Sequence, residues 1–121
     1  MTWDDVLRLA HAFPGVEDGT CYHTPALRVR GKLIGRLHQD GDDVILRMDR
    51  GSRAVLLRVR PEVFYITEHY APYDWVRVRL ALVSEAELRA VFTDAWRSQA
   101  PKRLLAEYDR ALAGNPALPT S

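Results

Sequence analysis

The chain has 121 residues, of which 47% are hydrophobic and 27% charged, so it has the size and composition of one soluble domain with its own core. Its net charge of +1 does not by itself indicate nucleic-acid binding, and no apolar run reaches the roughly 20 residues that span a bilayer. A single cysteine, Cys21, excludes an internal disulfide, and the acidic start of the chain is unlike a signal peptide, so we expect a cytoplasmic protein.

The first half of the chain predicts a helix followed by three strands. Thr2 can cap a helix whose apolar positions recur at helical spacing until Pro14-Gly15 ends it. An acidic linker, residues 15–20, is expected next. Strand patterns then cover residues 26–30, 32–38 and 44–48, and the turn residues between them indicate an antiparallel meander.

The middle of the chain predicts a short helix and a hairpin. Asp49 caps a helix over residues 50–59, in which Ala54, Val55 and Leu57 can pack inward. Two strands follow, residues 63–66 and 75–82, joined by a loop over residues 67–74.

The last part of the chain predicts two helices. Ser84-Glu85-Ala86-Glu87 is a capping box that starts a long helix, and Pro101 separates it from a helix over residues 102–113. We expect an ordered core of residues 2–113 and a frayed tail, 114–121. The element order predicts a single domain, residues 1–121, of the α+β class: one antiparallel β-sheet with helices packed on one face.

The strand at 75–82 indicates a basic, aromatic outer face on the sheet. Its alternate residues are apolar, and those between them include Trp75, Arg77 and Arg79. The earlier strands are expected to add further cations to this face: Arg28, Arg30, Lys32 and Arg36. No carboxylate is expected within these strands, and arginines repel one another unless anions lie between them. Phosphates would satisfy them, whereas in the alternative they pair with loop carboxylates: Glu62, Glu68 or Asp74.

Two further groups are candidates for binding. Rings gather in the loop and at the start of its following strand, where His69, Tyr73 and Trp75 can stack on bases or line a pocket. Alternatively, these rings form a small core that pins the loop to the sheet. Lys102 and Arg103 begin the last helix, where unpaired backbone N–H groups add to their charge, and are a second anion-binding candidate.

No catalytic or metal-binding set is recognisable, so we expect a non-enzymatic protein without metal or cofactor. The four histidines show no metal-ligand spacing. Cys21 and His23 could form a thiol–imidazole pair if their segment is a strand, but a buried structural cysteine is the simpler interpretation.

Three segments together resemble the MmcQ/YjbR family of small bacterial proteins: GTCYHTPALRVRGKLIGRL, PEVFYITEHYAPYDWVRVRL and DAWRSQAPKRL. The resemblance covers roughly residues 6–105 and implies a CyaY-like, or frataxin-like, α+β fold and a DNA-binding role. A frataxin-like fold would also suggest iron binding. This chain departs from that pattern, because Asp4 and Asp5 are the only clustered acids of the first helix.

Our leading hypothesis from the sequence is a DNA-binding domain whose basic face contacts phosphates with little sequence specificity. Reversing Arg77 and Arg79 to Glu should then abolish binding with little change in melting temperature. A module for a small anionic ligand is the alternative, favoured by a concave pocket near His69 and Trp75. A protein-interaction domain is a further alternative, favoured by an exposed apolar patch around Ile34. The oligomeric state stays open.

Overall fold

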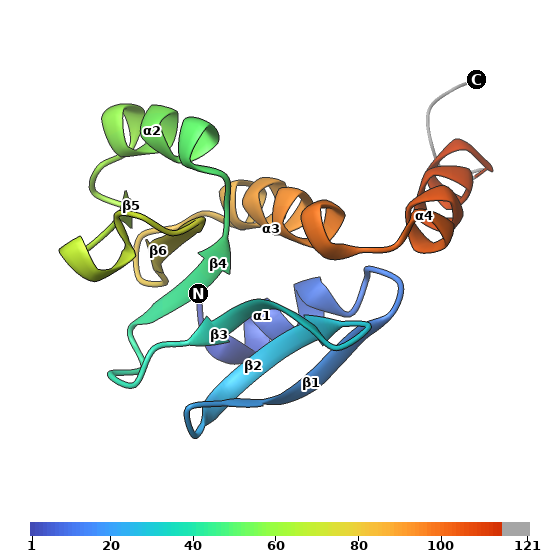
Figure 1. Ribbon diagram of the computed structural model, residues 1–121, viewed down its shortest axis with the longest axis horizontal. Helices are drawn as coiled ribbons and strands as arrows, with labels where there is room; N and C mark the ends of the chain where they lie inside the picture. Colours follow the sequence, from blue (N-terminus) through green and yellow to red (C-terminus); the bar gives the residue numbers. More distant parts are fainter. Residues whose placement is uncertain (115–121) are drawn as a thin grey trace.

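The computed structural model describes residues 1–114, in which four α-helices accompany one six-stranded sheet (Figure 1). The elements are α1 (Trp3–Ala10), β1 (Val16–Cys21), β2 (Thr24–Val29), β3 (Lys32–Leu37), β4 (Asp43–Arg47), α2 (Arg50–Val59), β5 (Phe64–Tyr65), the 3-10 helix η1 (Glu68–Tyr70), β6 (Trp75–Arg79), α3 (Glu85–Gln99) and α4 (Lys102–Gly114). The expected tail lies outside the described residues except for Gly114.

All neighbouring strands are antiparallel, in the order β1-β2-β3-β4-β6-β5. The predicted meander therefore forms one side of the sheet, and β6 pairs with its last strand while β5 lies at the far edge. Figure 1 shows α1 and α3 lying along the same side of this sheet. The structure thus confirms the predicted α+β class.

The core lies between the sheet and these helices. Trp96 of α3 is fully buried there beside Phe13, which also packs against Phe92, and the Trp96 indole N–H donates to the carbonyl oxygen of Pro14 over 2.9 Å. The predicted capping box at Ser84 is present, with hydrogen bonds in both directions to Glu87. Local caps and one shared core therefore account for the placement of the helices.

The prediction of an acidic linker at residues 15–20 is wrong, because residues 16–21 form the edge strand β1. It pairs with β2 from Val16 opposite Val29 to Cys21 opposite Thr24. Most of its side chains are exposed, because an edge strand lying beyond the core needs no apolar alternation. The hydrophobic pattern consequently could not distinguish this strand from a loop.

A bulge in β3 corrects the predicted position of Ile34. The pairing with β2 steps from Leu27 opposite Gly35 to Arg28 opposite Leu33, so β3 carries one extra residue at Ile34. The extra residue reverses the alternation, and Ile34 is fully buried in the core. The exposed apolar patch that would have favoured a protein-interaction domain is therefore absent at this residue.

No helix in residues 1–114 is long and apolar enough to cross a membrane.

Candidate functional site: an aromatic pocket on the outer face of the sheet

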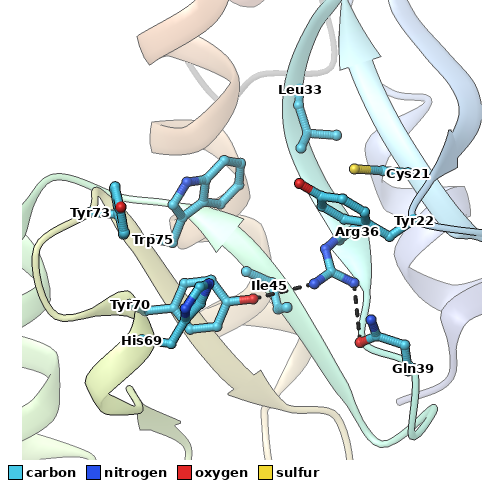
Figure 2. Close-up of a pocket in the computed structure, with 10 residues that line it drawn as sticks. All are labelled: Cys21, Tyr22, Leu33, Arg36, Gln39, Ile45, His69, Tyr70, Tyr73 and Trp75. Carbon is cyan, nitrogen blue, oxygen red and sulfur yellow. Dashed lines mark hydrogen bonds between the residues drawn. The ribbon is translucent and has the colours of Figure 1, made fainter.

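The face of the sheet opposite α1 and α3 contains a hollow of about 520 Å³, which we call the aromatic pocket. Five of its lining residues carry rings: Tyr22, His69, Tyr70, Tyr73 and Trp75. Figure 2 shows these rings around the space, from the β1–β2 turn on one side and from the η1 loop and β6 on the other. The remaining lining residues are Cys21, Leu33, Arg36, Gln39 and Ile45.

Arg36 supplies the charge of the aromatic pocket. Its position on β3 was predicted to be an exposed part of a basic face, but the residue is only 8% exposed. Its Nη1 donates to Thr24, Leu37 and Gln39 over 3.4–3.5 Å, and its Nη2 donates to the Tyr70 hydroxyl over 3.3 Å. These bonds are longer than the usual ~2.9 Å, so they satisfy the guanidinium weakly.

Within residues 1–114, Arg36 forms no ion pair with a carboxylate. Burying a charge is costly unless a counter-charge or strong hydrogen bonds compensate it. A buried arginine with only long, neutral partners therefore favours an anion from outside the chain. The Tyr22 ring, centred 5.4 Å from the guanidinium carbon, adds a cation–π contact.

The turn that carries Tyr22 has an unusual backbone. Tyr22 and His23 form the two-residue connection between β1 and β2, and both have positive φ angles, 52° and 65°. Such hairpin turns normally use Asn or Gly at these positions. Strained conformations of this kind concentrate at functional sites, and here the turn holds Tyr22, which is 74% exposed, beside Arg36.

Arg53 of α2 organises the opposite wall of the aromatic pocket. Its Nη1 donates to the backbone carbonyls of Tyr70, Tyr73 and Trp75 over 3.2, 2.7 and 2.9 Å, and its Nη2 donates to that of Ala71 over 2.9 Å. The residue is 6% exposed. One buried guanidinium thus fixes the loop segment that presents three of the five rings.

The predicted inward face of α2 is wrong for Ala54 and Val55, whereas Leu57 packs against the core as predicted. Ala54 and Val55 are exposed, Leu57 is partly buried, and Arg53 is the buried residue of this helix. Helical periodicity predicts apolar residues on the inward face, whereas here four backbone carbonyls of residues 70–75 accept hydrogen bonds from a buried arginine.

Arg77 and its partners overturn the prediction that the strands contain no carboxylate. β4 begins at Asp43, one residue before the predicted strand, and Asp43 is buried. Arg77 binds it through Nη2 at 2.6 Å and Nε at 3.1 Å, and its Nη2 also reaches Asp40 at 3.3 Å. The carboxylates that pair with this face are therefore Asp43 and Asp40. Glu62, Glu68 and Asp74 do not pair with Arg77.

Tyr65 completes this charged cluster, because its hydroxyl donates to Asp43. Burial, and then the hydrogen bond and charge of Asp43, raise the pKa of Tyr65 to about 12. The backbone N–H of Asp42, followed by His38 and Arg77, lowers the pKa of Asp40. At neutral pH the cluster is thus an internally compensated network.

Other cations predicted for the outer face also have partners. The guanidinium carbon of Arg79 lies 4.0 Å from the Tyr65 ring centroid, and Arg79 Nη1 donates to the Glu62 carbonyl over 3.1 Å. Arg28 donates to the Thr20 carbonyl over 2.9 Å. The sheet therefore does not present the flat row of solvated arginines that the sequence predicted.

Three predicted cations gather at a separate place, which we call the basic corner: Arg30, Lys32 and Arg103. They line a hollow of about 420 Å³ between the β2–β3 turn and the start of α4, and within residues 1–114 no carboxylate lines it. Lys102 precedes Arg103 on α4 but does not line this hollow.

The two residues considered for thiol–imidazole chemistry separate at the end of β1. Cys21 ends the strand and lines the aromatic pocket, where it is partly buried, so it is not the buried structural cysteine that the sequence favoured. His23 lies in the turn and is exposed. Among the described residues, no group of three or more His, Cys, Asp or Glu is placed to hold a metal ion.

The part of the chain that contains this pocket matches a known protein family. The YjbR family model matches residues 11–98. The chain belongs to the YjbR family. The matched span includes every residue that lines the aromatic pocket, whereas Arg103 of the basic corner lies outside it. This confirms the resemblance that the sequence motifs indicated.

Two mycobacterial proteins and one solved structure match this YjbR protein over most of its length. It is 29% identical over 122 residues to uncharacterized protein Rv2570 of Mycobacterium tuberculosis and to uncharacterized protein Mb2600 of Mycobacterium bovis, covering 88% of this chain and 95% of each relative. The crystal structure of Deinococcus radiodurans protein DR2400, described with a DUF419 domain, matches with a TM-score of 0.66 and 18% identity. That match covers 89% of this chain and 88% of the other, so the two share the fold.

Of the residues predicted for stacking or pocket formation, the YjbR fold brings together His69, Tyr73 and Trp75. Tyr22 and Gln39 also line the pocket, although the sequence did not indicate them as pocket residues. Tyr22 lies in a two-residue turn between two strands, which is a hairpin signal. This hairpin could not be recognised from the sequence, because β1 lacks a hydrophobic pattern.

Proposed function

We propose that this YjbR protein binds a small organic anion in the aromatic pocket. The observation that carries the proposal is Arg36, which is nine-tenths buried, lines the pocket and, among the described residues, has only long hydrogen bonds to neutral partners. A volume of about 520 Å³ lies within the range of small-molecule sites, which combine a mostly apolar lining with a few polar groups. Gln39 and Tyr70 supply such groups beside Arg36.

The same geometry makes DNA binding across the sheet a weaker proposal. A duplex needs solvated cations spread over an accessible surface. Arg77 is engaged by Asp43, and Arg79 lies against Tyr65. The outer face instead contains a concave pocket lined by His69 and Trp75. Such a pocket is the feature that the sequence hypothesis associated with a small ligand.

Replacing Arg36 by Gln is expected to weaken binding of organic anions by about 10- to 100-fold. The reason is the loss of charge-assisted hydrogen bonds worth about 1.5–3 kcal/mol. The measurement is a thermal-shift screen of small carboxylates and phosphate esters, followed by calorimetric titration of the hits. Arg28→Gln is the matched control, because Arg28 lies on the same face outside the pocket. Hits that bind Arg36→Gln as tightly as they bind Arg28→Gln would refute the proposal.

A nucleic-acid contact at the basic corner is the second candidate function. It is supported by the convergence of Arg30, Lys32 and Arg103 around a hollow without lining carboxylates. Phosphate-driven binding would fall steeply as salt rises from about 50 to 200 mM.

The test of this second function is fluorescence anisotropy of a labelled random-sequence duplex and a single strand. The double variant Lys32→Glu, Arg103→Glu is expected to lose binding, while Arg36→Gln retains it. Absence of binding at the low-salt end would exclude the nucleic-acid function without affecting the small-anion proposal.

A further inference from the structure

We infer that the ligand of the aromatic pocket is a planar aromatic monocarboxylate. Its carboxylate would contact Arg36 and Tyr70, and its ring would lie between Tyr22 and Trp75. This inference rests on the proposed small-anion function and specifies the chemical class of the ligand.

The charge of the pocket is the first reason for a monocarboxylate. Among the described residues that line the pocket, Arg36 is the only Lys or Arg, and none is Asp or Glu. One guanidinium compensates one negative charge, whereas a phosphate monoester carries about −1.5 to −2 at neutral pH. The planar fork of arginine also matches the two oxygens of a carboxylate.

The geometry of the donors is the second reason. Arg36 Nη2 and the Tyr70 hydroxyl oxygen are 3.3 Å apart, so one carboxylate oxygen can accept hydrogen bonds from both groups. The contacts that Arg36 makes with Thr24 and Gln39 are 3.4 and 3.5 Å long. A carboxylate would replace these weak partners by short, charge-assisted ones at little cost.

The aromatic walls are the reason for a flat ring. Figure 2 shows the Trp75 indole on one side of the pocket and Tyr22 with Arg36 on the other, with Ile45 between them. The indole is held in place from outside the pocket by Arg47, whose guanidinium carbon is 4.6 Å from the ring centroid. Aromatic ligands gain from offset or edge contacts with such rings, in addition to the area that they bury.

The experiment is calorimetric titration of the full chain with five probes: 2-naphthoate, its uncharged amide, cyclohexanecarboxylate, AMP and inorganic phosphate. We expect 2-naphthoate to bind, and the amide and cyclohexanecarboxylate to bind at least about tenfold more weakly. Arg36→Gln and Tyr22→Ala should each lower the affinity for 2-naphthoate by a similar factor. Tyr22 is largely exposed, so its removal leaves the core intact, and Arg28→Gln is the control.

The outcomes separate the ligand class from the proposed function. If AMP, inorganic phosphate or cyclohexanecarboxylate binds at least as tightly as 2-naphthoate, and Arg36→Gln loses this binding, the aromatic monocarboxylate is overturned. The small-organic-anion function then stands if an organic anion is among the probes that bind, and binding of inorganic phosphate alone overturns both. Binding of the amide as tight as that of 2-naphthoate, or unchanged binding in Arg36→Gln, overturns both. Absence of binding by all four anions also overturns both.

Discussion

Replacing Arg53 by Met is expected to lower the free energy of unfolding by about 3 kcal/mol and to abolish ligand binding in the aromatic pocket. Arg53 donates to four backbone carbonyls, those of Tyr70, Ala71, Tyr73 and Trp75. A buried acceptor left without its donor costs about 1–3 kcal/mol, and the loop can relax to recover part of the total. Urea denaturation followed by circular dichroism measures the change in stability.

Two variants of the same helix sharpen the Arg53 test. Arg58→Met is the matched control, since Arg58 is exposed on α2, and its effect should stay within about 0.5 kcal/mol. Arg53→Lys keeps the charge but cannot span four carbonyls from one ammonium group, so its stability should lie between those of Arg53→Met and the wild type. Equal stability of Arg53→Met and Arg58→Met would show that the guanidinium does not hold the loop.

Reversing Arg77 to Glu is expected to destabilise the fold by about 3–5 kcal/mol, because it leaves the buried Asp43 facing a second carboxylate. The matched variant is Arg79→Glu. Arg79 contacts the Tyr65 ring and two backbone carbonyls and has no carboxylate partner within residues 1–114, so its reversal should cost about 1 kcal/mol or less. Urea midpoints at neutral pH compare the two variants.

A second substitution tests the cause of the Arg77 effect. Adding Asp43→Asn to Arg77→Glu removes one of the two opposing charges, so the double variant should be more stable than Arg77→Glu alone. A double variant less stable than Arg77→Glu would show that packing, and not charge, dominates. The Arg77 and Arg79 double reversal suggested by the sequence is therefore expected to lower the melting temperature, whereas the sequence alone predicted little change, and so would not separate binding from folding.

Much of the fold follows from local signals in the sequence. The Ser84 capping box, the proline at residue 101 and the helical spacing of apolar residues located α3 and α4 closely. Strict alternation located β6 from Trp75 onward. These predictions hold because each signal acts within one or two turns of chain, where sequence spacing and spatial proximity coincide.

The site depended more on tertiary structure. The sequence indicated that His69, Tyr73 and Trp75 could line a pocket, and they do. It placed Arg36 among solvated cations, because alternation alone cannot show that the η1 loop and the Tyr22 turn enclose this part of the sheet. It gave no indication that Arg53 would bind loop carbonyls, of which the first, that of Tyr70, lies 17 residues later.

The sequence by itself thus determined the fold class, the helices, most of the strands and a set of cations and rings on one face. Only the tertiary structure decided which cations are compensated. Asp43 compensates Arg77, and backbone carbonyls compensate Arg53. Arg36, in contrast, has no carboxylate partner within the described residues. The physical reason is that charge compensation and enclosure depend on strand register and loop position. Both bring together residues that are far apart in the chain.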